Sequence, residues 1–256
     1  MNNIKGIILA GGDGTRLKPM TDLISKQLLP VYNKPMIFYP LSLLIKAKIK
    51  DILIITKPDE QENFKKLIGD GKKWDANIDY ITQPEPKGIA QSYILAREWL
   101  DNSKSVLILG DNLFFGQGLQ ALLTSVYERN TGATIFGYQV SDPKRYGVVN
   151  LDKNNKIISI EEKPENPRSN WAVTGLYFYD ERAPHFAEKL APSKRGELEI
   201  TALNNLYLKN NNLNIEFLRK GFAWLDTGTP DALLEASNFV KIIETRQGLS
   251  IGDPND

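Results

Sequence analysis

The chain has 256 residues, of which 41% are hydrophobic and 25% charged, enough for one globular domain of ordinary composition and too few for two large independent ones. Its formal net charge of +1 gives no global attraction to nucleic acid or to an anionic membrane, and neither is expected as a partner. It has no cysteine and a single histidine, His185, which excludes disulfides, thiolate catalysis and a metal site of several histidines.

Strand and helix patterns alternate along the first half of the chain. Short apolar runs that end at glycine or polar residues predict buried strands, and apolar residues at helical spacing predict helices between them. The expected strands are 4–10, 51–56, 78–82 and 105–109, and the expected helices are 35–48, 59–68 and 88–100. This rhythm predicts an α/β fold whose mostly parallel, Rossmann-like sheet is flanked by helices on both faces.

The second half is less regular. Strands are expected over 133–140, 147–151, 156–162, 172–179 and 213–218, with tight turns that insert β-hairpins, and helices over 181–190 and 199–210. A last helix should begin at Thr229-Pro230-Asp231, because Pro suits the first turn of a helix, and it should end near Gly248. The polar tail 250–256 is expected to fray.

The N-terminus predicts no targeting segment. Its apolar stretch is shorter than that of a signal peptide, and no run of about 18 apolar residues is present to span a membrane. We therefore expect a cytoplasmic protein.

The strongest local feature is a glycine-rich turn directly after the first strand. Three glycines within four positions allow backbone N–H groups to converge on an anion, and Arg16 follows with a permanently charged fork that suits phosphate oxygens. Two known phosphate motifs fail on spacing. Leu17 stands where the dinucleotide fingerprint needs its third glycine, and the Gly-Lys-Ser/Thr ending of ATPase loops is absent. Glycine content alone would also fit a plain strand-to-helix turn.

A longer ordered set of motifs makes the turn specific. Residues 11–17 (Gly-Gly-Asp-Gly-Thr-Arg-Leu) with 25–31 (Ser-Lys-Gln-Leu-Leu-Pro-Val) and 33–37 resemble the signature of the sugar-phosphate nucleotidyltransferases. The residues of these motifs are most similar to those of the glucose-1-phosphate thymidylyltransferases, of which this chain would be a short form. The likeness continues in order through Gln83-Pro84, 88–91, 109–112, 146–149, 161–164, 173–177 and 224–229.

The resemblance implies the nucleotide-diphospho-sugar transferase fold as one domain over residues 1–256. Residues up to about 130 would form a nucleotide-binding half, about 131–228 a sugar-binding half, and about 229–256 a C-terminal helix and tail. The implied nucleotide-binding residues are Gly11, Gly12, Gly14, Thr15, Arg16, Gln83, Gly88 and Asp111, where Gln83 and Gly88 contact the base.

The resemblance also assigns the charged positions. Asp111 and Asp226 would hold Mg²⁺, which prefers carboxylate and phosphate oxygens. Arg16, Lys26 and Lys163 would be the catalytic cations. The implied sugar-phosphate-binding residues are Gly147, Glu162, Lys163, Val173 and Arg195. Taken singly, each aspartate would read as a turn residue and each lysine as a surface group.

The implied reaction transfers a deoxythymidylyl group from dTTP to glucose 1-phosphate and releases pyrophosphate. It would be the first step toward dTDP-deoxysugars such as dTDP-rhamnose, which serve cell-surface polysaccharide biosynthesis. Because the sugar phosphate is already an oxyanion nucleophile, no general base is needed. Charge neutralisation and in-line alignment would provide the catalysis.

Two alternatives stay open, and parts of the chain depart from the family pattern. Gln83 suits uracil as well as thymine, so a related enzyme that uses UTP or another sugar 1-phosphate is one alternative. The other is a non-catalytic nucleotide-sugar binding protein, since fold alone does not fix function. Gln117, Gly118, Ala202 and the early end of the chain depart from the family's usual residues near its regulatory site. The resemblance implies a homo-oligomer, dimer or tetramer, but these departures argue against the family's usual tetramer and feedback control. If a deoxythymidine-diphosphate sugar inhibits the enzyme, we expect the inhibition to be purely competitive with the nucleotide.

Overall fold

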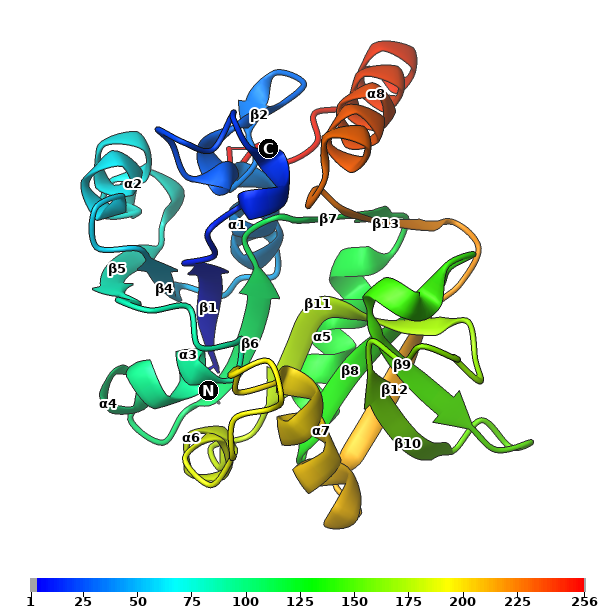
Figure 1. The fold of residues 1–256 in the computed structure, drawn as a ribbon. Coiled ribbons are helices and arrows are strands. Elements are labelled where there is room, and N and C mark those ends of the chain that lie inside the picture. The colour runs from blue at the N-terminus through cyan, green and yellow to red at the C-terminus, as the bar shows by residue number, and fades with distance from the viewer. Residues whose placement is uncertain (1–3, 256) are drawn as a thin grey trace. The chain divides into compact units, whose positions relative to one another are not determined.

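A computed structural model describes residues 4–255, and their contacts form two compact units (Figure 1). The β1 unit contains Lys5–Pro86, Ile108–Thr124 and residues 222–255. The β11 unit contains Ile4, Lys87–Leu107 and Ser125–Gly221. The sequence suggested two consecutive halves that meet near residue 130, whereas these units interleave along the chain.

Three parallel strands form the base of the β1 unit. In β1 (Ile4–Ala10), β4 (Asp51–Thr56) and β5 (Asn77–Thr82), Ala10 lies opposite Thr56 and Thr56 opposite Thr82, so all three strands end at one edge. The unit also contains α1 (Phe38–Lys46), α2 (Gln61–Ile68), α8 (Pro230–Gln247) and the short pair β2 (Pro30–Val31) and β3 (Lys34–Pro35). Ile52–Ile55 are fully buried, as expected of strands covered on both faces.

A second strand pair of the β1 unit was not predicted. β7 (Asn112–Gly116) pairs antiparallel with β13 (Phe222–Asp226), and Asp226 lies opposite Asn112. Each strand has only five residues, and its partner is about 110 positions away in sequence, so a local pattern could not reveal the pairing.

The β11 unit is a mixed sheet with helices. Its strands follow the order β12 (Leu213–Leu218), β8 (Ala133–Gln139), β11 (Trp171–Tyr179), β9 (Gly147–Leu151) and β10 (Ile157–Glu162). Only β12 and β8 run parallel, and the other pairs are antiparallel. Its helices are α3 (Gln91–Leu95), α4 (Arg97–Leu100), α6 (Ala183–Ala187) and α7 (Ile200–Lys209). β6 (Lys104–Leu109) and α5 (Leu119–Arg129) each contribute residues to both units.

The predicted α/β class is confirmed, and two local expectations are wrong. The helix expected over 88–100 is two helices separated at Ala96, and nothing in the local sequence explains the break. The tail expected to fray is packed over its described part. Ile251 is 6% exposed and its N–H donates to Glu244 Oε1 at 2.8 Å, while Ser42 Oγ donates to the Asp253 carbonyl at 3.1 Å. None of the helices within residues 4–255 is long and apolar enough to cross a bilayer.

Candidate functional site

The glycine-rich turn begins where β1 ends. Gly14 adopts a left-handed φ of +62°, which starts a 3₁₀ turn over Thr15–Leu17, and Leu17 is fully buried as an anchor. Gln83 follows the end of β5 and is 2% exposed. Its amide lies against Gly11, where a Cβ would come within 2.3 Å of Gln83 Oε1. The amide predicted to read the base therefore lies directly beside the turn predicted to bind phosphate.

Two expected cations of the β1 unit lie near this turn. The exposed Arg16 places its guanidinium over Gly228, where a Cβ would lie 2.8 Å from Nη2. Lys26 begins a 3₁₀ turn, packs its stem against Gly14, and its Nζ pairs with Asp111 Oδ2. Lys26 thus contacts the glycine-rich turn directly, and Arg16 extends from the same turn toward Gly228.

The two aspartates expected to hold a metal lie on neighbouring chain segments. Asp226 is the last residue of β13, and Asp111 directly precedes β7, to which β13 is paired. Thr227 fixes this junction, because its N–H and its Oγ1 both donate to the Asp111 carbonyl, at 3.1 and 2.8 Å. Although Asp111 and Asp226 are 115 positions apart in sequence, the paired backbone places them on adjacent segments.

Asp111 is held as a carboxylate. Its side chain is only 13% exposed, and this burial by itself would raise its pKa. The charge and hydrogen bond of Lys26 and a hydrogen bond from Asn112 outweigh the burial, so the net pKa of Asp111 lies below its ordinary value. An ionised carboxylate here is the form that a divalent cation requires.

Two residues that hold Asp111 in place through hydrogen bonds were not predicted from the sequence. Asn112 Nδ2 donates to Asp111 Oδ1 at 3.0 Å, and Trp224 Nε1 donates to Asn112 Oδ1 at 2.6 Å. Asn112 is 3% exposed, so its buried amide links Trp224 to Asp111. Its position beside an aspartate at a strand end was the available signal.

The residues expected to contact the sugar lie together in the β11 unit. The antiparallel register places Glu162 opposite Gly147, and a Cβ at Gly147 would lie 3.8 Å from the Val173 Cβ. Thr201, in the first turn of α7, donates to Glu162 Oε2 at 2.5 Å. Thr201 was not among the predicted site residues, although it lies in a Glu-Ile-Thr motif beside Ala202.

Two cations border this group. Lys163 has a φ of +43° and its N–H donates to the Tyr146 carbonyl at 3.0 Å, which turns the chain directly after β10. Lys163 Nζ and Arg195 Nη1 each lie 3.7 Å from Glu162 Oε1. Arg195 Nη2 also pairs with Glu197 at 2.6 Å. The structure thus brings together all five residues of the expected sugar-phosphate set.

Arg195 is further held by an acidic neighbour. Glu199 Oε1 lies 3.7 Å from Arg195 Nε and accepts a hydrogen bond from Ser193 Oγ at 2.8 Å. Burial and the nearby charge of Glu162 raise the pKa of Glu199. The guanidinium is therefore surrounded by three carboxylates, which fix its position beside Glu162.

Gly88 differs from its expected setting. It does not open a helix, since α3 begins only at Gln91. Its φ is +100°, and a Cβ would lie 2.4 Å from the Leu198 carbonyl oxygen. The backbone next to Gly88 is hydrogen-bonded to Leu198, whose N–H donates to the Lys87 carbonyl at 2.7 Å. Only glycine fits here, for a steric reason that is separate from any base contact.

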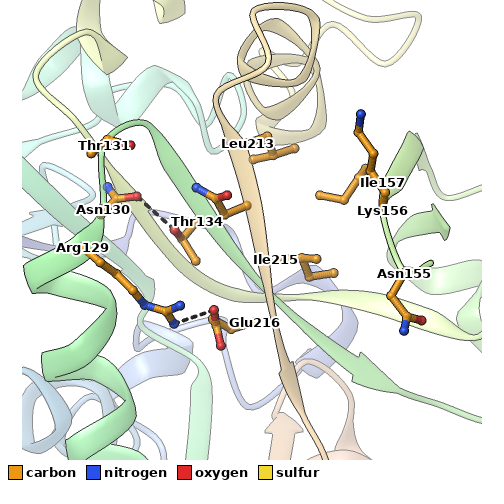
Figure 2. A pocket seen from close by; sticks show the side chains of 11 residues that line it. Arg129, Asn130, Thr131, Thr134, Asn155, Lys156, Ile157, Leu213, Ile215 and Glu216 are labelled. Carbon is orange, nitrogen blue, oxygen red and sulfur yellow. Dashed lines mark hydrogen bonds and ion pairs between the residues drawn. The ribbon is translucent and has the colours of Figure 1, made fainter. Parts of the chain in front are cut away.

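The pocket drawn in Figure 2 does not coincide with the expected site. This cavity of about 450 Å³ lies in the β11 unit. Its polar groups satisfy one another, since Arg129 pairs with Glu216 at 2.6 Å and Thr134 donates to Asn130 at 2.9 Å. None of the expected site residues lines it, so we assign it no ligand.

Comparison with known proteins defines the class. The family model described as "Nucleotidyl transferase" matches residues 5–242. The chain therefore belongs to the nucleotidyl transferase family, and it is a transferase enzyme.

Its relatives are more specific. It is 56% identical over 256 residues to a glucose-1-phosphate thymidylyltransferase from Xanthomonas campestris pv. campestris (strain B100), covering 100% of this chain and 87% of the relative. The enzyme of that name from Neisseria meningitidis serogroup A is 53% identical over 248 residues, which is 97% of this chain and 86% of the relative. The resemblance drawn from the motifs is confirmed.

Solved structures agree on the fold. The crystal structure of a Bacillus anthracis chain assigned as a glucose-1-phosphate thymidylyltransferase, in complex with a sucrose, superposes with a TM-score of 0.86 at 39% identity, covering 92% of this chain and 94% of that one. A UDP-glucose pyrophosphorylase bound to UDP-glucose gives a TM-score of 0.82 at 23% identity, over 94% and 99% of the two chains, which shows a shared fold.

Proposed function

We propose that this enzyme transfers a deoxythymidylyl group from dTTP to glucose 1-phosphate, giving dTDP-glucose and pyrophosphate. The observation that carries the proposal is the junction of Asp111 and Asp226 beside Lys26, in the same unit as the glycine-rich turn and Gln83. The names of the relatives support dTTP and glucose 1-phosphate as the substrates.

The carboxylate pair fits a divalent cation that substrate helps to hold. Within residues 4–255 no group of three or more Asp, Glu, His or Cys side chains is arranged to hold a metal by itself. Mg²⁺ is commonly bound by one or two carboxylates, with phosphate oxygens and waters as the other ligands. We propose that Asp111 and Asp226 hold Mg²⁺, which when bound would supply positive charge at the α-phosphate oxygens.

The protein's own groups then have separate tasks. Arg16 and Lys26 neutralise the leaving pyrophosphate, while Lys163 and Arg195 hold the attacking sugar phosphate. A phosphate oxygen of glucose 1-phosphate forms a bond to the α-phosphorus as the bond to the bridging oxygen of pyrophosphate breaks. The nucleophile is already anionic, so no general base is required. Removing one such electrostatic group should raise the barrier by about 3 kcal/mol.

We assign the contacts to the base and to the sugar to different residues. The Gln83 amide can pair with a donor and an acceptor of the thymine edge. Glu162 accepts hydrogen bonds from sugar hydroxyls, and Gly147 leaves room for the ring. That the enzyme works as a homo-oligomer in the cytoplasm stays a prediction.

A substrate panel tests the function. Nucleoside triphosphates, including dTTP and UTP, are crossed with several sugar 1-phosphates, and pyrophosphate release is followed with Mg²⁺ present. We expect the highest kcat/KM for dTTP with glucose 1-phosphate. A higher value for UTP or for another sugar would favour the related enzyme, and no release with any pair would favour a non-catalytic binding protein.

A further inference from the structure

The glycine-rich turn contains a negative charge that opposes its proposed ligand. Asp13 lies between Gly12 and Gly14, within the segment whose N–H groups we assign to the nucleotide phosphates, and its side chain is 47% exposed. A carboxylate within this turn repels a triphosphate bound to the turn's N–H groups, because like charges at short distance repel each other. The turn therefore needs a compensating cation.

Lys57 supplies that cation from the neighbouring strand. Its Nζ lies 3.0 Å from Asp13 Oδ1. The parallel register aligns the last residues of β1 and β4, Ala10 and Thr56, so the glycine-rich turn and Lys57 leave the sheet at adjacent strand ends. The hydrogen bond to Asp13 and the charges of Asp13, Asp59 and Glu60 together raise the pKa of Lys57, against a smaller opposing effect of burial.

We propose that Lys57 is a positioning residue of the phosphate cradle, which neutralises Asp13 so that the turn can accept a nucleoside triphosphate. The proposal rests on the proposed function, because it takes the turn as the nucleotide phosphate site. An exposed ion pair contributes little to folding stability. The Lys57–Asp13 pair should instead affect nucleotide binding, because an uncompensated carboxylate repels the phosphates of the incoming nucleotide.

The partners have opposite effects when they are removed. Lys57→Met leaves Asp13 charged and alone and should weaken dTTP binding about tenfold at low ionic strength. Asp13→Asn removes the repulsion itself and should bind dTTP at least as tightly as the parent. Combining Asp13→Asn with Lys57→Met should return the dissociation constant to within about twofold of the parent value.

Calorimetric titration of the full chain with dTTP at low and high salt measures these effects. Lys72→Met is the matched control, because Lys72 also pairs with an aspartate, Asp70 at 2.7 Å, in the same unit and changes the net charge equally. Thymidine, which lacks phosphate, is the second probe, read by competition with dTTP. We expect the Lys57→Met defect to shrink at high salt, to be absent for thymidine and to be absent in Lys72→Met.

Three results would overturn the proposal. Equal weakening of dTTP and thymidine would mean that the pair only maintains the shape of the turn. If Lys72→Met weakens dTTP binding equally, the effect of Lys57 comes only from the net charge of the chain. If the double variant binds dTTP as weakly as Lys57→Met, Lys57 does not act by neutralising Asp13. If the parent chain binds no dTTP, the proposed function itself fails, which is a separate outcome.

Discussion

Single residues at the ends of β7 and β13 set the proposed chemistry of this enzyme. Thr227 joins the backbone of the two segments, and Asn112 together with Lys26 occupies both oxygens of Asp111. Lys26 is thus paired with the carboxylate that we assign to the metal.

Asp226→Asn should abolish most turnover without unfolding the chain. The amide keeps the volume of the carboxylate but removes half of the charge available to a divalent cation, so we expect a loss of at least about 100-fold in kcat. The assay is pyrophosphate release at saturating Mg²⁺, with thermal unfolding as the check on folding. Asp231→Asn, on the exposed first turn of α8, is the control, and a comparable rate in Asp226→Asn would remove it from the mechanism.

Gly228→Ala should act through Arg16. The new Cβ would lie 2.8 Å from Arg16 Nη2, and the guanidinium is the mobile end of an exposed side chain, so it would move with little effect on stability. We expect kcat to fall about tenfold or more with an unchanged melting temperature. In an Arg16→Met background the same substitution should have no further effect. A full second loss there would mean that Gly228 acts independently of Arg16.

At the scale of elements, α8 contacts both the C-terminal segment and the β2–β3 hairpin within the β1 unit. Its buried face contributes Ala236 and Val240 to a core cluster that also contains Tyr39 and Ile251. Glu244, near its end, accepts hydrogen bonds from Lys34 Nζ at 2.8 Å, from Asn33 Nδ2 at 2.9 Å and from the Ile251 N–H at 2.8 Å. One carboxylate therefore connects three segments.

Glu244→Gln should destabilise the chain in a pH-dependent manner. Burial would raise the pKa of Glu244, but its hydrogen bonds and the charge of Lys34 lower it overall. A lowered folded-state pKa contributes stability above the unfolded pKa, about 4.3, and the contribution is lost as pH falls through the folded value. We expect the substitution to cost about 1–2 kcal/mol at neutral pH.

Urea unfolding across a pH series measures this cost. The difference between the parent and Glu244→Gln should narrow as the pH falls below the unfolded pKa of about 4.3 and through the lowered folded pKa of Glu244. Glu235→Gln, on the exposed face of the same helix, should change stability little at any pH. A pH-independent cost would show that the hydrogen bonds matter and the charge does not.

At the scale of the whole molecule, the two units contain different parts of the expected site. Arg16, Lys26, Gln83, Asp111 and Asp226 belong to the β1 unit, and Gly147, Glu162, Lys163, Val173 and Arg195 belong to the β11 unit. Gly88, expected at the base, is the exception among the nucleotide residues, since it belongs to the β11 unit. We therefore expect changes in one unit to affect one substrate selectively.

Lys163→Ala should raise the KM for glucose 1-phosphate about tenfold or more, and leave the KM for dTTP within about twofold. Lys163 lies beside Glu162 in the β11 unit, whereas the glycine-rich turn belongs to the β1 unit. Steady-state kinetics with each substrate varied in turn provides the measurement, and Lys153→Ala, an exposed lysine of the same unit, is the control. Equal increases for both substrates would place Lys163 elsewhere.

The sequence by itself determined those features that local chemistry encodes. β1, β4 and β12 have the predicted bounds because apolar runs between polar residues define them. α8 starts as predicted because Thr229 accepts a hydrogen bond from the Ala232 N–H and Pro230 fits the first turn. The ordered motifs likewise identified the family.

Only the tertiary structure decided what depends on pairing between distant segments. It joined β7 to β13 and so brought Asp226 next to Asp111, placed Thr201 on Glu162 and Lys57 on Asp13, and packed the tail against Tyr39. Each of these contacts joins positions tens to hundreds of residues apart. Local propensity has no information about such partners, because their free energy comes from burial and hydrogen bonds that exist only after the chain has folded.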